Sequence, residues 1–380
     1  MRSLVAMSGG VDSAVAAFLV KEQGHDLVGA NMRFWEYNVA CNTLNTKSSC
    51  CSPEDLADAE KSAASIGIPF YAIKMEKDFR GAVIEPFIQD YQNGRTPNPC
   101  VHCNTFIKFG EFYDKAKALG YEKIVTGHYA NITQLESGRY AVSPAVDDHK
   151  DQSYYLYGLS QEALAQTLFP LAGLTKKEVR SIAEENNLVV AKKPESQEIC
   201  FIPDNDYRKF LAREGVAFTP GFFRNTAGHI VGKHDGKEKF TIGQRKGLGI
   251  ALGEPAYVIE ILSTGDVILG NKAELDRTRF NLKDIVYQGL ELSDLLEMNK
   301  VQVQIRYNSK PTPGKVSQDD DGNLVIELDE PASAITAGQS AVLYDPEFGY
   351  ILCGGKIQTA SMFSDHAHRS SSSKPHVEHF

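Results

Sequence analysis

The N-terminal stretch MRSLVAMSGGVDSA constrains the fold more than any other part of the chain. Residues 2–7 form a short apolar run that predicts a strand, and the residues at 8–10 interrupt it with two glycines. From Val11 the apolar residues recur at helical spacing, which predicts a helix that ends near Gly24. Glycines let backbone N–H groups approach an anion closely, and a helix N-terminus adds unpaired donors. The stretch therefore predicts a phosphate-binding turn between a strand and a helix.

Asp12 refines this interpretation. A carboxylate next to a polyphosphate is repelled unless a cation lies between them, so Asp12 indicates Mg²⁺, with capping of the helix as an alternative role. The stretch is neither a Walker GxxxxGK[ST] loop nor a dinucleotide-binding GxGxxG turn. SGGVDS instead resembles the PP-loop of the ATP pyrophosphatases, enzymes that cleave ATP to AMP and pyrophosphate. We therefore favour nucleotide binding over a plain glycine turn.

Length and composition limit the remaining possibilities. A chain of 380 residues predicts two or three domains. No apolar run approaches the roughly 20 residues of a membrane span, and no signal peptide is recognisable, so we expect a cytoplasmic protein with no membrane partner. The seven cysteines then indicate thiol chemistry or metal binding, not a framework of structural disulfides. The formal net charge of −9 argues only weakly against binding to nucleic acid.

The order of the predicted elements indicates the fold class. Strands and helices alternate over residues 1–130, which is typical of a doubly wound parallel sheet with ligands beyond the carboxyl ends of its strands. The composition changes after Asp204, and beyond residue 255 short segments of period two predict antiparallel strands in a barrel or sandwich. Asp321-Gly322 is the expected hairpin turn between two of these strands, and Thr175 with Glu178 three residues later predicts a capping box at the start of a helix. We expect a Rossmann-like catalytic α/β domain, a small central domain, a C-terminal antiparallel β-barrel and a disordered tail, over residues 1–204, 205–275, 276–357 and 358–380.

Two further stretches point to chemistry. GRTPNPCVHCN, at residues 94–104, is expected to be an extended loop that presents Cys100 and Cys103 as a CxxC pair. No second pair completes a structural zinc site, so a redox or sulfur-handling role is favoured. Considered alone, Cys200 is interpreted as a small hydrophobic residue of the core. At residues 232–250 five basic residues outnumber two acidic ones, which predicts a phosphate-contacting surface, or alternatively a solvated turn.

Seven motifs that follow one another along the chain resemble those of the tRNA-specific 2-thiouridylases. They are SGGVDS, GRTPNPCVHCN, TGHYA, KDQSYYLYGLS, SQEICF, TIGQRKGLGI and TAGQSAVLYD. The resemblance covers residues 1–357. It implies a transferase that uses ATP and Mg²⁺ to replace O2 of the wobble uridine (U34) of tRNA with sulfur, and that takes this sulfur from a persulfide donor protein.

The resemblance also implies roles for single residues. Asp12, Cys103 and Cys200 would be catalytic, with Cys103 as the nucleophile and Cys200 as the persulfide carrier. ATP would bind to Ala6, Met7, Ser8, Gly9, Gly10, Val11, Asp12, Ser13, Met32 and Gly127. The target base would contact Asn98, Pro99 and Cys100. The tRNA would contact His128, Lys150, Asp151, Gln152, Arg306, Tyr307 and Gln339.

Alternatives to the persulfide route remain open. In that route Cys103 and Cys200 end as a disulfide that must be reduced. Many proteins of the family that this chain resembles carry the motif NPDxxCN at the catalytic loop. This chain has Cys100 in place of the aspartate. Cys100, Cys103 and Cys200 would then suit a [4Fe–4S] cluster with one open iron. A PP-loop ligase acting on a small molecule and a zinc-stapled, non-enzymatic RNA-binding protein are the alternatives from other classes.

Overall fold

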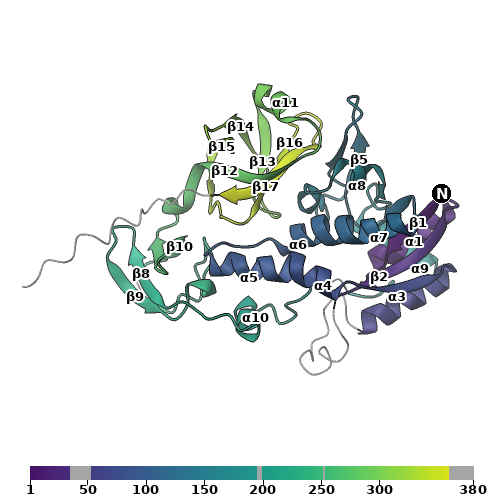
Figure 1. Cartoon of the computed structure of the whole chain (residues 1–380), viewed down its shortest axis with the longest axis horizontal. Coiled ribbons are helices and arrows are strands. Elements are labelled where there is room, and N and C mark those ends of the chain that lie inside the picture. The colour runs from purple at the N-terminus through teal and green to yellow at the C-terminus, as the bar shows by residue number, and fades with distance from the viewer. Residues whose placement is uncertain (35–52, 195–198, 251–252, 359–380) are drawn as a thin grey trace, which may run out of the picture.

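The computed structural model describes residues 1–34, 53–194, 199–250 and 253–358, and Figure 1 shows three regions. A parallel sheet flanked by helices comes first, a four-stranded sheet follows, and a closed barrel comes last. The predicted fold class is therefore confirmed. The tail predicted from residue 358 lies almost wholly outside the described residues. No helix within the described ranges is long and apolar enough to cross a membrane.

The N-terminal sheet has the strand order β3-β2-β1-β4-β7, and all of its neighbouring strands are parallel. Its strands are β1 (Arg2–Ala6), β2 (Asp26–Arg33), β3 (Phe70–Lys74), β4 (Lys123–Val125) and β7 (Thr167–Leu168). From β1 the chain adds β2 and β3 on one side, then crosses to the other side with β4. The order thus reverses at β1, and ligands of such sheets bind beyond the carboxyl ends of the strands at this point.

Helices cover both faces of this sheet because side chains of a strand alternate between the faces. In β1, Leu4 and Ala6 join one hydrophobic core, whereas Val5 and Met7 next to it join the other. The second core also holds α1 (Val11–Glu22), α3 (Pro53–Ile66) and α9 (Lys176–Glu185). The first core holds α4 (Glu76–Phe79), η1 (Arg80–Ile84), α5 (Glu85–Gln92), α6 (Pro99–His102), η2 (Cys103–Glu111), α7 (Phe112–Ala118), η3 (Ser153–Leu156) and α8 (Gln161–Ala165). A hairpin of β5 (Asn131–Gln134) and β6 (Tyr140–Ser143) completes the domain.

The segment that carries the CxxC pair differs from the prediction. Residues 94–98 lack regular structure as expected, but α6 begins at Pro99, so both cysteines lie on helical backbone. Proline is favourable at the first position of a helix because its missing N–H would be unpaired there anyway. The side chain of Asn98 caps this helix by accepting a hydrogen bond from the backbone N–H of Val101 at 3.4 Å. From Cys103 the helix continues as the π-helical segment η2.

The central region contains α10 (Tyr207–Arg213) and a sheet of order β10-β11-β8-β9. Its strands are β8 (Gly221–Asn225), β9 (Ile230–His234), β10 (Tyr257–Ile261) and β11 (Val267–Gly270). The short 3-10 turns η4 (Lys237–Lys239) and η5 (Ala273–Leu275) lie in the connections. Phe223, Val258 and Val267 are buried in a small core of their own. The strands near residues 257 and 267 therefore belong to this sheet and not to the barrel.

The last region is a closed barrel of order β12-β15-β14-β13-β16-β17. Its elements are β12 (Asp276–Tyr287), α11 (Leu292–Glu297), β13 (Val301–Gln304), β14 (Thr312–Gln318), β15 (Leu324–Ser333), β16 (Ser340–Tyr344) and β17 (Ile351–Gln358). The predicted hairpin turn at Asp321-Gly322 joins β14 to β15, with Gly322 at a φ of +81°. Closure leaves no sheet edge open along the barrel, since each of its strands has two neighbours.

The barrel is attached to the catalytic domain by specific polar contacts. Gln339 donates hydrogen bonds to the carbonyl oxygens of Thr96 and Pro97 at 3.1 and 2.9 Å. Lys356 forms an ion pair of 2.7 Å with the buried carboxylate of Asp90. Figure 1 shows the barrel against the α5–α6 side of the catalytic domain. The barrel therefore holds the backbone just before the CxxC helix.

Candidate functional site

The site lies beyond the carboxyl ends of β1 and β4, where the strand order predicts a ligand. The loop after β1 is held by Ser13, whose hydroxyl donates to the carbonyl oxygen of Gly10 at 3.0 Å and accepts from the N–H of Ser8 at 3.2 Å. Gly10 is the N-cap of α1 and makes no side-chain cap hydrogen bond. The first turn of α1 thus has the unpaired donors and the dipole end that favour an anion.

Two positions near this loop require glycine because the backbone of another segment lies close to each of them. Gly9 has a φ of +79°, and a methyl group there would overlap the carbonyl oxygen of Asp55 at the start of α3. Gly127, after β4, would place a Cβ only 2.7 Å from the backbone of Asp12 and Ser13. Neither position accepts a side chain without movement of backbone. The two strand ends therefore meet closely enough to form one wall of a pocket.

A cavity of about 250 Å³ opens between the loop, β2 and β4. It is lined by Ala6, Met7, Ser8, Asp12, Ser13, Asn31, Met32, Phe34, Lys108, Thr126, Gly127, His128 and Gln152. Asn31 is buried, and its amide donates to the carbonyl oxygen of Met7 at 2.8 Å, which fixes the end of β1. Seven of the ten residues predicted to bind ATP line this cavity, and Gly9, Gly10 and Val11 do not. Their part in ATP binding stays a prediction.

A second cavity of about 580 Å³ adjoins the first one, since Ser8, Asp12, Gly127 and Gln152 line both. It also contains the loop residues Gly10 and Val11, and the side chains of Asp55, Tyr129, His149, Lys150, Tyr155, Lys176, Lys193 and Tyr307. Three lysines line it together with two aspartates, Asp12 and Asp55, and the first turn of α1 adds N–H donors for an anion. The first cavity has the partly apolar lining that suits a nucleoside, and the second has the charges that suit polyphosphate.

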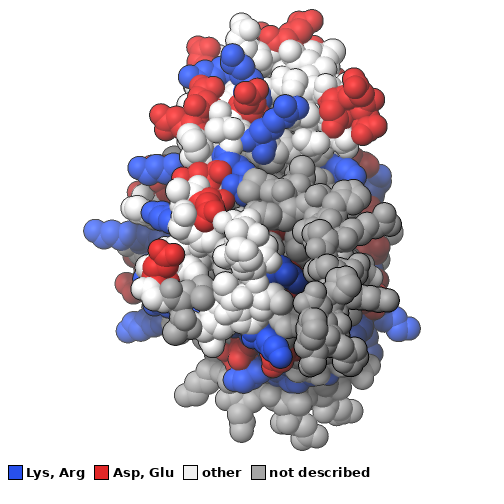
Figure 2. Space-filling view, turned by 90° about the vertical axis from the view of Figure 1, so that its left-hand side faces the viewer, with Lys and Arg blue, Asp and Glu red and all other residues white. Residues whose placement is uncertain are grey.

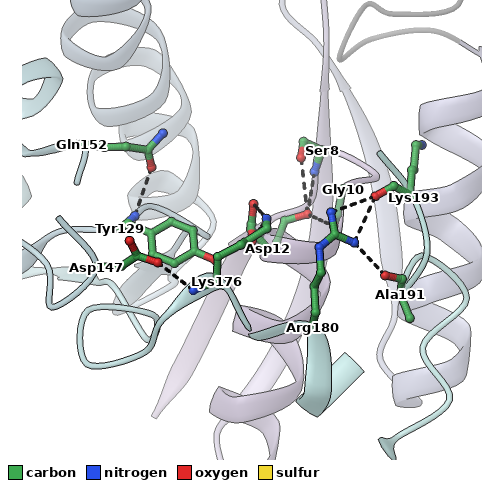
Figure 3. A network of polar contacts seen from close by, with 11 residues as sticks. Ser8, Gly10, Asp12, Tyr129, Asp147, Gln152, Lys176, Arg180, Ala191 and Lys193 are labelled. Atoms are coloured by element: carbon green, nitrogen blue, oxygen red, sulfur yellow. Dashed lines mark hydrogen bonds and ion pairs between the residues drawn. The ribbon is translucent and has the colours of Figure 1, made fainter. Parts of the chain in front are cut away.

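Asp12 lies at the junction of the cavities and contacts a lysine (Figure 3). Its two carboxylate oxygens accept from Nζ of Lys176 at 2.7 and 2.8 Å, and one of them also accepts from the hydroxyl of Tyr129 at 2.8 Å. The alternative that Asp12 caps α1 is therefore wrong. A single carboxylate at a phosphate site fits Mg²⁺, which takes one or two protein carboxylates and completes its shell with phosphate oxygens and water.

Three lysines of the two cavities, Lys108, Lys176 and Lys193, were not predicted from the sequence. Lys176 is the first residue of α9, whose predicted capping box is present: Thr175 accepts from the N–H of Glu178, and Glu178 accepts from the N–H of Thr175. Lys193 pairs with Asp55 and Asp58 at 2.6 Å each. Lys108 is on η2, 3.3 Å from Nε2 of His128. The capping box was the available signal for Lys176, since it places the residue at a helix start.

His128, predicted to contact tRNA, is buried at the floor of the first cavity. Its Nδ1 shares a hydrogen bond of 2.7 Å with the hydroxyl of Thr126, and its ring packs against Phe109 and Phe169. Burial, followed by the charge of Lys108, holds the pKa of His128 well below its usual value. The imidazole is therefore neutral. It contacts the ammonium group of Lys108 inside the protein and is not part of an exposed surface.

Most of the other predicted tRNA contacts are engaged inside the protein. Asp151 accepts from the N–H and hydroxyl of Ser153, and burial raises its pKa. Gln152 accepts from the N–H of Tyr129 at 3.0 Å. Arg306 donates to the carbonyl oxygen of Ala334 at 2.7 Å and is largely buried, which lowers its pKa. These three side chains hold loops in place around the site.

Tyr307 and Lys150 do line the second cavity. The ring of Tyr307 contacts that of Tyr155 in a tilted arrangement, with ring centroids 4.5 Å apart. Burial is the main cause of the raised pKa of Tyr155, and the neighbouring Cys100 thiol is the next. Exposed Cys100 is therefore next to two half-buried tyrosines that line the cavity. Tyr155 was not singled out by the sequence analysis, although it lies in the aromatic stretch of KDQSYYLYGLS.

The cysteines occupy different environments. Cys100 is exposed, whereas Cys103 and Cys200 are half-buried at the margin of the same hydrophobic core. Cys353 is fully buried in the barrel, where burial raises the pKa of its thiol to about 12. Among the described residues, no group of three or more His, Cys, Asp or Glu side chains is arranged to hold a metal ion. The three-cysteine ligand set is thus not formed here, and Cys41, Cys50 and Cys51 lie outside the described residues.

The basic side chains of the central region differ in their exposure and in their ion pairs. Lys237 is buried, and Lys239 pairs with Asp235 at 2.7 Å, so the prediction of a uniform phosphate-contacting surface is wrong for Lys237. Arg245 and Lys246 are exposed. A groove of about 930 Å³ runs beside them and is lined by Arg208, Lys233, His234, Asp235, Lys239, Phe240, Lys246, Gly247, Leu248 and Gly249. Figure 2 looks onto the side of the molecule where this region lies, and basic and acidic side chains are interspersed over its visible part.

Known proteins resemble the chain along nearly its whole length. Family models described as tRNA methyl transferase HUP domain, tRNA methyl transferase PRC-barrel domain and Aminomethyltransferase beta-barrel domain match residues 1–204, 208–271 and 277–357. The tRNA-specific 2-thiouridylase MnmA of Leptospira biflexa is 54% identical over 360 residues, 94% of each chain. The protein of that name from Clostridioides difficile is 43% identical over 362 residues, which cover 94% of this chain and 98% of that one.

Proposed function

The chain belongs to the tRNA-specific 2-thiouridylase family, and from this premise we propose that it catalyses the ATP-dependent 2-thiolation of the wobble uridine (U34) of tRNA. The observation that carries the proposal is the link between the thiol segment and the nucleotide cavities. The helical segment η2 begins at Cys103 and brings Lys108 into the first cavity. A π-helical segment is uncommon and is frequent at functional sites. Cys103 and the cavity residue Lys108 are thus on one helical segment, which connects the sulfur chemistry with the ATP chemistry.

The first step activates the uridine. O2 of the base attacks the α-phosphorus of ATP, the base becomes adenylated, and pyrophosphate leaves into the second cavity. The first turn of α1 and the lysines at positions 150, 176 and 193 would bind the negative charge of the leaving group. Asp12 is the residue that would hold Mg²⁺, which supplies neutralisation of the departing pyrophosphate. Lys108, in contact with neutral His128, would face the α-phosphate from the other cavity.

The second step replaces oxygen by sulfur. Cys200 carries a terminal persulfide sulfur, received from a persulfide donor protein, and this sulfur attacks C2 of the activated base. AMP leaves with the former O2, so that the base is bonded to Cys200 through a disulfide. The thiolate of Cys103 then attacks the Cys200 sulfur, which releases 2-thiouridine and leaves a Cys103–Cys200 disulfide. A thiol reductant supplies two electrons and two protons to restore both cysteines.

The tRNA is the substrate in this proposal, and its uridine is read in a single-stranded loop. Leaving the stack of its neighbours allows a base to reach the pocket. Asn98 and Cys100 lie at the start of α6, and Cys100 is next to Tyr155, whose ring contacts that of Tyr307. Aromatic faces of this kind stabilise a splayed base by about 1–3 kcal/mol. No step is routed through an iron–sulfur cluster, because the described cysteines do not form its ligand set.

Mass spectrometry of nucleosides tests the function directly. Unmodified tRNA is incubated with protein, ATP-Mg²⁺ and a persulfide donor, and 2-thiouridine is expected only with the complete mixture. Cys103→Ser and Cys200→Ser should each abolish the product and keep ATP binding, because serine cannot hold a persulfide. Cys353→Ala, in the barrel, is the matched control and should keep the activity.

Other outcomes would redirect the proposal. ATP turnover that needs no tRNA and survives loss of both thiols would favour a ligase acting on a small molecule. Binding of tRNA with no release of pyrophosphate would favour a non-enzymatic RNA-binding protein. Product formed by Cys200→Ser at the wild-type rate would exclude Cys200 as the sulfur carrier.

A further inference from the structure

The partners of Asp12 carry an inference that rests on the proposed function and extends it. Asp12 is the residue expected to hold Mg²⁺, yet both of its carboxylate oxygens accept from Nζ of Lys176, at 2.7 and 2.8 Å (Figure 3). The hydroxyl of Tyr129 donates to the same carboxylate at 2.8 Å. A carboxylate has about four lone-pair sites, and these donors occupy three of them, so a divalent cation has to compete with the ammonium group for Asp12.

Lys176 is built into the site from the opposite side of the pocket. It is the first residue of α9, and its backbone N–H donates to the carboxylate of Asp147 at 2.9 Å. Only 12% of its side chain is exposed, because it crosses the wall of the second cavity to reach Asp12. The backbone anchor fixes the base of the side chain, while rotation about its four-carbon stem can move the ammonium within the cavity.

Lys193, in the same cavity, is held differently. It pairs with the carboxylates of Asp55 and Asp58 at 2.6 Å each, on the neighbouring helix α3. Arg180 donates to its carbonyl oxygen and to that of Ala191, so the backbone there is fixed as well (Figure 3). Two carboxylates balance Lys193 whether or not a ligand is bound. Lys176 instead shares the carboxylate that the metal requires.

We propose that Lys176 is an exchangeable counter-ion, which occupies the carboxylate of Asp12 before the nucleotide binds and moves to the phosphates when Mg²⁺ takes its place. Both states keep each charge compensated within the pocket. Before binding, the ammonium neutralises the carboxylate. After binding, Asp12 would hold Mg²⁺, and the ammonium would contact a phosphate oxygen in the same cavity. The site therefore favours the metal–nucleotide complex over the metal alone, since only the complex offers Lys176 a new anion.

The proposal predicts opposite effects of one substitution on two affinities. In Lys176→Met the competitor of the metal is gone, so Mn²⁺, used as the probe for Mg²⁺, should bind the nucleotide-free protein more tightly, by about fivefold for a pair of this kind. The same variant loses a phosphate contact, so its affinity for Mn²⁺-ATP should fall. A residue that only supports the fold would not strengthen any affinity on removal.

Binding of Mn²⁺ is measured by electron paramagnetic resonance, with and without ATP. Lys177→Met is the matched control, because it removes an exposed lysine from the adjacent position of α9, and it should leave both affinities unchanged. Asp12→Asn should abolish the binding of Mn²⁺ at this site. Tyr129→Phe removes the other donor to Asp12 and gives a milder second variant if Lys176→Met does not fold. It should strengthen the binding of Mn²⁺ to a smaller extent.

An unchanged or weaker affinity of nucleotide-free Lys176→Met for Mn²⁺ would overturn the proposal, and so would an unchanged affinity for Mn²⁺-ATP. If Lys176→Met does not fold, an unchanged or weaker affinity of Tyr129→Phe for Mn²⁺ would overturn it. These readouts need no tRNA and no sulfur donor. A wild-type protein that makes no 2-thiouridine but shows the exchange would therefore refute the proposed function and leave the exchange intact.

Discussion

Replacing Gly127 by alanine tests the close approach of the two strand ends that form the nucleotide pocket. The added methyl group would lie 2.7 Å from the carbonyl carbon of Asp12 and from the N–H nitrogen of Ser13. Both neighbours are backbone atoms of the first turn of α1, so no flexible side chain can move aside. Gly127 does not have a positive φ, and the effect is therefore steric and not conformational.

The size of the effect follows from this distance. An ordinary contact of a Cβ is about 3.4 Å or longer, so the loop and the start of α1 must move apart by about 0.7 Å. Overpacking of this kind typically destabilises a protein by about 1–3 kcal/mol. For a domain of 150–250 residues this lowers the melting temperature by roughly 2 to 12 °C. The same displacement moves Asp12, and an error of 1 Å in the position of reacting groups reduces the rate by about 100-fold.

Thermal unfolding and release of pyrophosphate measure the two consequences separately. Gly173→Ala is the matched control, because a Cβ at that position meets nothing within 4 Å. It should be neutral or slightly stabilising, since alanine restricts the unfolded chain more than glycine does. Gly127→Ala with the melting temperature and the ATP affinity of the wild type would refute the reasoning. The strand ends would then tolerate a side chain, and the pocket wall would not depend on their contact.

Two further predictions concern charge. Arg245→Ala and Lys246→Ala should each weaken the binding of tRNA in a filter-binding titration. Each should also lower the slope of log affinity against log salt concentration by about one unit at most, because both side chains are exposed. Lys237→Ala should lower stability and leave this slope unchanged, because Lys237 is buried. Burial keeps His128 neutral in the folded protein while the unfolded chain binds a proton below a pH of about 6.5, so the free energy of unfolding should fall as the pH drops below that value. The melting temperature of His128→Gln should depend less on pH in this range than that of the wild type. An equal dependence on pH would contradict the effect that we assign to the burial of His128.

Local signals explain which parts of the fold could be predicted from the sequence. The strand, glycine turn and helix at the N-terminus, the capping box at Thr175 and the hairpin turn at Gly322 each depend on a few consecutive residues. The pairing of Asp12 with Lys176 depends on residues 164 positions apart, and no periodicity reports such a contact. Charge counts failed in a similar way at Lys237, because they cannot tell a buried ammonium group from an exposed one.

Gln339, a predicted tRNA contact, shows how a residue of the barrel can affect the site through the backbone that it holds. Gln339 is on the barrel side of the molecule, and its amide holds the carbonyl oxygens of Thr96 and Pro97, directly before the residue that caps the CxxC helix. The N–H of Thr96 in turn donates to the carbonyl oxygen of Ala337 at 2.9 Å. A change at Gln339 therefore reaches the thiols through the start of α6. The barrel therefore helps to position the helical segment on which Cys100 and Cys103 lie. The geometry of these thiols thus depends on residues more than 200 positions further along the chain.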